Sequence, residues 1–230
     1  MKKNNLKILT LLFIATLSLS SCSSDDAGES NGTTTGNYLP LAVGNKWHYT
    51  NGTTATLDQI IGTTTFGGTT YYEDDDSGEE IDIQNWLAKK GASYYNKVGE
   101  TTYTETSTTI VVQSYEMKML RDDLAVGESW NGSASPKVTY SGGSGSGSFK
   151  AHITYEGTIT AKDVSETLGS ITYNNIIKVE LDAVVNSNGQ INTIHSEYWF
   201  AKDIGLIYDS ATSSVDNITK TRYLTSYELN

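Results

Sequence analysis

Acidic side chains form the densest group of potential metal ligands in this sequence, at residues 73–82, which read Glu-Asp-Asp-Asp-Ser-Gly-Glu-Glu-Ile-Asp. Hard cations such as Ca²⁺ prefer several carboxylate oxygens at once. The segment does not follow the EF-hand pattern, because with Gly78 in the sixth position the twelfth residue would be Gln84. We therefore expect an acidic hairpin loop, with weak calcium binding as the alternative, and we assign no metal site and no cofactor.

Histidines offer a second possible chemistry, but His48, His152 and His195 are too far apart in sequence to form a closely spaced ligand pair. His195 and Glu197 would share one face of a strand and could contribute to a metal or acid–base site. Glycoside hydrolysis requires two carboxylates at a set separation, and the abundance of carboxylates here identifies no pair. We predict no catalytic residues and a protein that is not an enzyme.

Aromatic residues occur in adjacent runs, which on a strand must point to opposite faces. In each run, one face is either covered by another element or available to a ligand such as a sugar or an apolar chain. The predicted ligand-facing residues are Tyr71, Tyr94, Tyr198 and Trp199, and packing in the core is the alternative.

The first residues have the layout of a secretory signal peptide over 1–21, with three lysines followed by an apolar run and small residues. The apolar run is too short to cross a bilayer. Leu19-Ser20-Ser21-Cys22 resembles a bacterial lipobox, in which the cysteine becomes the first mature residue and carries acyl chains. The resemblance implies lipid attachment at Cys22 and a membrane as partner.

Cys22 is the only cysteine, so no disulfide can form within the chain. One acyl chain holds a protein only reversibly, whereas the several chains that a lipobox implies give durable anchoring. The following Ser23–Asp26 resembles the surface-export signal of Bacteroidetes-type lipoproteins. We expect a lipid-anchored outer-membrane protein exposed at the cell surface, with the periplasmic face of that membrane as the alternative.

Charge excludes two classes of partner. The formal net charge is −11, and the predicted signal peptide carries three lysines and no acids, so residues 22–230 carry −14. Nucleic-acid phosphates and anionic lipid surfaces should repel such a chain, and we predict no nucleic-acid partner. Residues 22–37, rich in Ser, Asp, Gly and Thr, predict a flexible acidic tether before a single domain at 38–230.

Strand patterns dominate that domain. Apolar and polar residues alternate over 149–161 and again over 171–185, and Asn188-Gly189 is a hairpin-turn signal before a partner strand at 190–201. Further strands are expected at 54–61, 69–73, 81–88, 93–98, 110–120, 206–210 and 218–229. The sequence predicts an all-β, many-stranded antiparallel curved sheet, an open barrel or a sandwich.

One heptapeptide occurs twice, Leu-Ala-Val-Gly-Asn-Lys-Trp at 41–47 and Leu-Ala-Val-Gly-Glu-Ser-Trp at 124–130. Weaker echoes follow in the same order, 67–71 with 169–173 and 86–91 with 199–205. Each glycine of the motif suits a turn, and each tryptophan then enters a strand as a core anchor. We predict two similar halves, 38–120 and 121–230. The alternative is that short sequence motifs typical of strands and turns recur by chance.

Both ends of the predicted domain resemble a group of uncharacterised bacterial lipoproteins of the Bacteroidetes type. Their patterns are Tyr-x-Pro-Leu-x-x-Gly-x-x-Trp-x-Tyr, matched at 38–49, and Trp-Phe-Ala-Lys-x-x-Gly-Leu, matched at 199–206. The resemblance implies a curved antiparallel sheet and supplies no catalytic residues. Asp209-Ser210-Ala211 also resembles an O-glycosylation acceptor of envelope proteins, which would place a glycan on Ser210.

Together these features predict a non-catalytic binding module for a glycan or an apolar ligand, held at the outer membrane. A structural or assembly component that binds another envelope protein is the alternative, and an envelope hydrolase is a third hypothesis.

Overall fold

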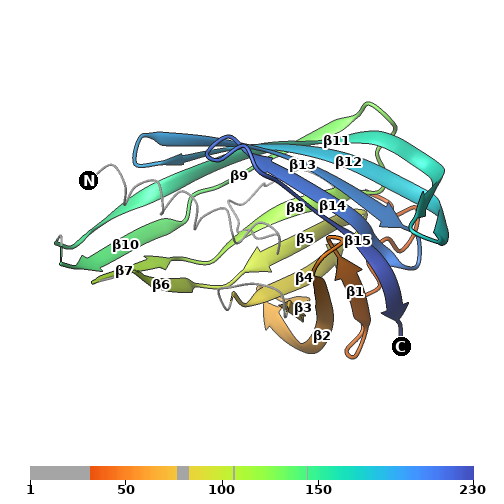
Figure 1. Ribbon diagram of the computed structural model, residues 1–230, viewed down its shortest axis with the longest axis horizontal. Helices are drawn as coiled ribbons and strands as arrows, with labels where there is room; N and C mark the ends of the chain where they lie inside the picture. Colours follow the sequence, from red (N-terminus) through yellow and green to blue (C-terminus); the bar gives the residue numbers. More distant parts are fainter. Residues whose placement is uncertain (1–31, 77–82, 106, 144) are drawn as a thin grey trace.

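The computed structural model describes residues 32–76, 83–105, 107–143 and 145–230 (Figure 1). Over these ranges the chain forms fifteen β-strands and no helix, which confirms the predicted all-β class. No helix in the described part of the chain could therefore span a membrane.

The strands are β1 (Lys46–Thr50), β2 (Ala55–Phe66), β3 (Thr69–Asp76), β4 (Asn85–Lys90), β5 (Ser93–Val98), β6 (Thr101–Glu105), β7 (Thr108–Val112), β8 (Tyr115–Arg121), β9 (Ser129–Ala134), β10 (Lys137–Gly142), β11 (Gly147–Leu168), β12 (Ile171–Ser187), β13 (Gln190–Ala201), β14 (Gly205–Ser213) and β15 (Thr219–Glu228). All pairs are antiparallel, in the order β6-β7-β10-β11-β12-β13-β14-β15-β1-β2-β3-β4-β5-β8, and β9 also pairs with β11.

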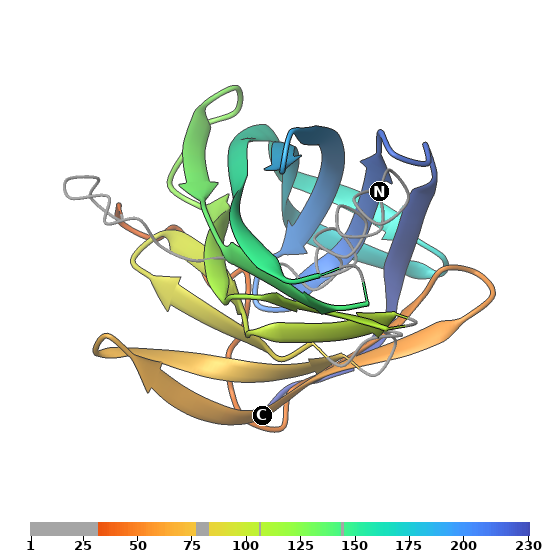
Figure 2. The ribbon, with the colours of Figure 1, turned by 90° about the vertical axis from the view of Figure 1, so that its left-hand side faces the viewer.

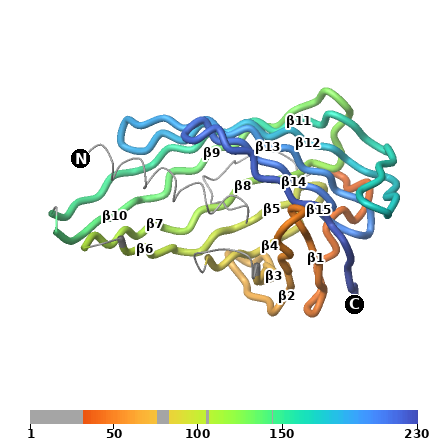
Figure 3. Tube along the Cα trace, in the orientation of Figure 1, coloured from red at the N-terminus to blue at the C-terminus, as the bar shows by residue number. Residues whose placement is uncertain are grey.

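The sheet curls so that the two ends of this strand order come together. They join in one long, bent hairpin, in which β5 continues into β6 and β7 continues into β8. Only residues 113–114 separate β7 from β8, and only residues 99–100 separate β5 from β6. The strands therefore surround a common interior, as Figure 2 shows. The tube in Figure 3 follows the long strand β11 along most of the molecule.

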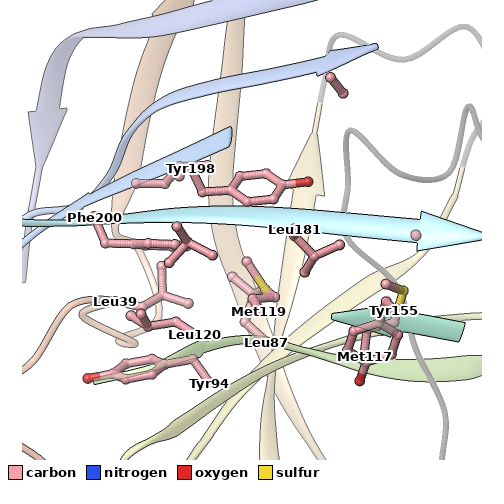
Figure 4. Packing of buried hydrophobic residues seen from close by; sticks show 14 of the residues in the cluster. Leu39, Leu87, Tyr94, Met117, Met119, Leu120, Tyr155, Leu181, Tyr198 and Phe200 are labelled. Atoms are coloured by element: carbon pink, nitrogen blue, oxygen red, sulfur yellow. The ribbon is translucent and has the colours of Figure 1, made fainter. Parts of the chain in front are cut away.

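Strand alternation fills this interior with side chains. Along β11, residues 151, 153, 155, 157 and 159 are buried and their neighbours are mostly exposed, as the predicted alternation requires. The core brings together residues from distant strands, including Tyr94, Met119, Leu181 and Phe200 (Figure 4). The concave face of the curved sheet is thus the hydrophobic core of the protein.

The two copies of the repeated heptapeptide form the same turn. In the first copy Gly44 N donates to Ile60 O (2.8 Å) and Ile60 N donates to Asn45 O (3.0 Å). In the second, Gly127 N donates to Ile159 O (2.8 Å) and Ile159 N donates to Glu128 O (3.0 Å). Both glycines have positive φ, +93° and +86°, which L side chains rarely adopt.

Strand order also repeats after each turn. Neighbouring strands pair in the order β1-β2-β3-β4-β5-β8 in the first half and in the order β9-β11-β12-β13-β14-β15 in the second. Tyr71 on β3 bonds to Glu116 on β8, and Tyr173 on β12 bonds to Leu224 O on β15 (3.3 Å). Each half is therefore a six-stranded meander, to which β6, β7 and β10 are additions.

The folded part begins before Tyr38, the residue at which the sequence predicts that the domain starts. Thr34 Oγ1 and Thr35 N donate to the carboxylate of Asp122 at 2.6 and 2.9 Å. Asp203 N donates to Asn37 O at 2.6 Å. Residues 34–37 thus belong to the folded domain, because its loops supply their hydrogen-bond partners.

Candidate functional site

Two of the four predicted ligand-facing aromatics, Tyr94 and Tyr198, lie in the core, and Tyr71 is buried on the outer face of β3. Tyr71, Tyr94 and Tyr198 are each at most 4% exposed. The hydroxyl of Tyr94 lies 2.8 Å from Asp122 Oδ2 and accepts the Tyr38 amide at 3.1 Å. Burial raises the pKa of Tyr94 and of Tyr198 above the ordinary tyrosine value. A ligand cannot reach Tyr94 or Tyr198 in this conformation, because the sheet closes over the face on which they lie. Side chains of Phe66, Lys90 and Glu116 contact Tyr71 on the outer face.

Trp199, the fourth predicted residue, lies on the outer face of β13 and is partly exposed. Its ring stacks on Tyr208 of β14, with centroids 4.4 Å apart, and Lys178 Nζ of β12 lies 3.6 Å from its centroid. Its indole N–H donates to Glu197 Oε1 at 2.6 Å. Neighbouring side chains therefore occupy much of this ring and leave only part of it for another molecule.

An interior charged network links three strands near the junction of the two halves. The Arg222 guanidinium on β15 donates to Asp209 Oδ2 on β14 (2.7 Å) and to Asp58 Oδ1 on β2 (2.8 Å). It also lies over the Tyr49 ring, 4.3 Å from the centroid. Burial raises the pKa of Tyr49 well above its ordinary value, and Asp58 raises it further. No local sequence pattern indicates this network, since its members are far apart in the chain.

A small cavity adjoins the network. Its volume is about 40 Å³, and apolar side chains line it together with Asp58, Asp74, Asn96 and Arg222. Asn96 is 1% exposed, and its Oδ1 has no hydrogen-bond partner among the described residues. A cavity this small and polar suits water, and it is too small for a sugar or an acyl chain.

A larger hollow lies on the outer face of β12, β13 and β14, with a volume of about 400 Å³. Carboxylate, imidazole, hydroxyl and amide groups line it, from Asp182, His195, Thr193, Thr212 and Asn217. Val184 adds an apolar surface that is 42% exposed. This set of donors and acceptors around an apolar contact is suited to a polyhydroxylated ligand.

His195 lies in this hollow with a partner other than the one considered from sequence. Its Nδ1 is 2.8 Å from Asp182 Oδ1, directly across the β12–β13 ladder. Glu197 instead accepts the Trp199 indole hydrogen bond. Cross-strand register brings His195 and Asp182 together, and the sequence could have indicated this pair because the Asn188-Gly189 turn sets that register.

The acidic segment 73–82 is described only in part, since residues 77–82 lie outside the described ranges. Glu73 Oε1 accepts a hydrogen bond from Gln84 Nε2 at 2.6 Å. Asp74 lines the interior cavity. Within the described residues, no group of three His, Cys, Asp or Glu side chains could hold a metal ion. Calcium binding by the whole segment remains a prediction.

The structure describes only one of the two predicted modification sites. Cys22 lies outside the described residues. Ser210 lies on the partly exposed outer face of β14, opposite Glu197 and Thr221 on the flanking strands. Asp209 of the same tripeptide is buried with Arg222. Glycosylation of Ser210 stays a prediction, and a transferase that reads Asp209 would have to act before folding.

No protein-family model and no curated protein matches this chain. Among solved structures, a candidate lipoprotein from Parabacteroides distasonis matches with a TM-score of 0.50 and 12% identity, over 83% of this chain and 98% of that chain. A candidate exported protein with a YmcC-like fold from Bacteroides fragilis gives a TM-score of 0.40 and 8% identity over the same shares. The match to the Parabacteroides distasonis protein concerns the fold alone.

Proposed function

We propose that this protein is a lipid-anchored outer-membrane protein, exposed at the cell surface, that binds glycans without catalysis. The lipobox at Leu19–Cys22 supports the anchor, and the fold is similar to that of a candidate lipoprotein. The hollow on β12–β14 carries the binding part of the proposal, since its volume and its polar lining suit one or two sugar rings.

An apolar ligand in the interior has less support. The cavity of about 40 Å³ has no room for an acyl chain, and three charged side chains line it. Burying an apolar chain beside these groups would cost them hydrogen-bonding partners. The outer hollow is therefore the proposed binding surface, and a glycan is the proposed ligand class.

Binding of the full-length lipidated protein, in detergent micelles, to a panel of immobilised bacterial and host polysaccharides tests this proposal. Val184→Trp fills the hollow, and Ile61→Trp places the same ring on an equally exposed site elsewhere, since the two residues are 42% and 49% exposed. We expect Val184→Trp to weaken binding at least tenfold and Ile61→Trp to leave it unchanged. Absence of binding across the panel would favour an assembly component instead.

A further inference from the structure

The small interior cavity is surrounded by more negative than positive charge. Asp58 and Asp74 line it, and Arg222 is the only basic side chain among the described residues of its lining. The same guanidinium also bonds to Asp209, which is 2% exposed, so three carboxylates share one arginine and leave a net charge of −2. Besides burial, the three carboxylates raise the pKa of Tyr49 and the guanidinium lowers it, so all four charges lie near one ring.

Two buried amide oxygens lie at the same part of the interior. Asn96 on β5 lines the cavity, is 1% exposed, and its Oδ1 has no hydrogen-bond partner among the described residues. Asn85 on β4 lies opposite Asp74, is also 1% exposed, and its Oδ1 likewise has no described partner. Leu87, two residues after Asn85, lies opposite Asn96, so the two amides are neighbours on the inner face. A buried oxygen without a donor lowers stability, so a further group is expected beside these amides.

A divalent cation meets both requirements of this site. A water molecule could donate to Asn96 Oδ1, but it brings no charge, and one proton on a carboxylate removes only one of the two negative charges. A divalent ion supplies both positive charges and binds oxygen atoms directly. Buried charges in proteins are generally paired or coordinate metals, which favours the ion over an unbalanced cavity.

The donor atoms and the volume of the cavity favour calcium. Carboxylate and amide oxygens are the ligands that Ca²⁺ prefers, and it tolerates irregular geometry, whereas Mg²⁺ requires a near-ideal octahedron and keeps several waters. The cavity of about 40 Å³ has room for one ion with about two waters. Asp74 is partly exposed, so the ion has a route from solvent.

We propose that the interior cavity binds one Ca²⁺ ion, with Asp58, Asp74 and Asn96 as its protein ligands. Two carboxylates and an amide make up this set, which agrees with the absence, among the described residues, of any group of three His, Cys, Asp or Glu side chains that could hold a metal. The site is separate from the outer hollow on β12–β14, and it shares only Asp74 with the acidic segment 73–82.

The ion would also strengthen the contact between the two halves. Asp58 and Asp74 come from β2 and β3 of the first half, and Arg222, which bonds to Asp58, comes from β15 of the second. Calcium bound to the folded protein alone should therefore raise its stability by mass action.

Calcium titration of the full-length lipidated protein, in micelles of a non-ionic detergent after treatment with EDTA, tests this site. With a Kd of about 0.5 mM, as in extracellular calcium modules, about 5 mM Ca²⁺ should raise Tm by about 4 °C. Isothermal titration calorimetry should give one ion per chain. The same concentration of Mg²⁺ should raise Tm by less.

Substitutions of Asn96 identify the cavity as the site. Asn96→Asp places a third carboxylate on the ion and should lower the Kd about tenfold, whereas Asn96→Ala should raise it about fivefold. Asn51→Asp is the control, because it adds the same charge in the exposed β1–β2 turn, where a carboxylate can accept the Thr53 and Thr54 amides as Asn51 Oδ1 does. It should leave the Kd unchanged. Near-UV circular dichroism verifies that each variant is folded.

Two results would overturn the proposal. If 5 mM Ca²⁺ leaves the Tm of the wild type unchanged, the cavity balances its charge by protonation instead of by a cation. If both Asn96 variants keep the wild-type Kd and the double variant Glu79→Gln/Glu80→Gln loses binding, calcium belongs to the acidic segment. A Kd that follows the substitutions of Asn96 and is unchanged in that double variant would support the interior site.

Discussion

At the scale of single residues, the interior of this protein depends on charged side chains that the sequence pattern does not identify. Arg222 bonds to Asp58 and Asp209, which belong to strands of different halves. Taking these ions out of water has a large cost, and their attraction offsets it only while the geometry is maintained. A single substitution in this network should therefore weaken the contact between the two halves.

Arg222→Met should lower the free energy of unfolding by about 3–5 kcal/mol, because it leaves two buried carboxylates without their arginine. Urea denaturation monitored by tryptophan fluorescence measures this change. Lys220→Met removes a positive charge from the same strand at an exposed position and should cost less than about 0.5 kcal/mol. Equal costs for the two variants would show that the interior network contributes no specific stability.

At the scale of elements, side chains hold together the boundary between β8 and β9, which we call the seam. Trp130 Nε1 donates to Lys118 O (3.2 Å), and Lys118 N donates to the Tyr155 hydroxyl (2.8 Å). Each aromatic ring also covers a glycine on the facing strand, since Trp130 lies against Gly157 and Tyr155 against Gly132. The absence of a side chain on those glycines makes room for the rings that bridge the seam.

Gly157→Ala should destabilise the protein by about 3 kcal/mol, because the new Cβ would lie 2.2 Å from Trp130 Cζ2 in a packed interior. Gly62→Ala is the control, since its Cβ would be no closer than 3.6 Å to any neighbour and should change stability by less than about 1 kcal/mol. Thermal unfolding of both variants measures the difference. A Gly157→Ala protein as stable as the control would mean that the ring does not pack as described.

The repeated turns make a paired prediction. Gly44→Ala and Gly127→Ala should each cost about 1–2 kcal/mol, because both positions need positive φ. The first should cost slightly more, since its Cβ would lie 2.6 Å from Asn230 Nδ2, whereas the second meets nothing within 4 Å. In an Asn230→Ala background, chemical denaturation should give equal costs. Costs that still differ by more than about 1 kcal/mol would show that the two turns are not equivalent.

At the scale of the whole molecule, buried tyrosines link stability to alkaline pH. Burial raises the pKa of Tyr94, Tyr115 and Tyr198 above 10, the ordinary value. In the unfolded chain these groups ionise near pH 10, whereas in the folded protein they stay neutral. The contribution of these tyrosines to the free energy of unfolding is thus fully present below pH 10. It decreases as pH rises toward the folded-state pKa values, by up to about 1.4 kcal/mol per pH unit for each group.

We therefore expect cooperative unfolding above pH 10, accompanied by a rise in tyrosinate absorbance at 295 nm. Tyr115→Phe removes one such group, so this variant should lose less stability than the wild type between pH 9 and pH 11. Denaturation curves at both pH values measure that loss. An identical loss in the two proteins would contradict the assignment of Tyr115 to this alkaline transition.

The sequence by itself determined the all-β class, the main strands and the turns between them, because alternation and Gly-containing turns are local properties. The period-two pattern at 149–161 lies within β11, and Asn188-Gly189 joins β12 to β13. The repeated heptapeptide also predicted where a glycine turn precedes a buried tryptophan, since that combination needs only a few neighbouring residues.

Only the tertiary structure decided which face of each strand became the interior and which distant residues met there. Tyr94 and Tyr198 suit a ligand surface or a core equally well by sequence, and the closing curvature of the sheet placed them in the core. Arg222 met Asp58, and Asp122 met Thr34, through pairings between strands far apart in the chain. Such contacts depend on the order of strands in the sheet, which no local pattern encodes.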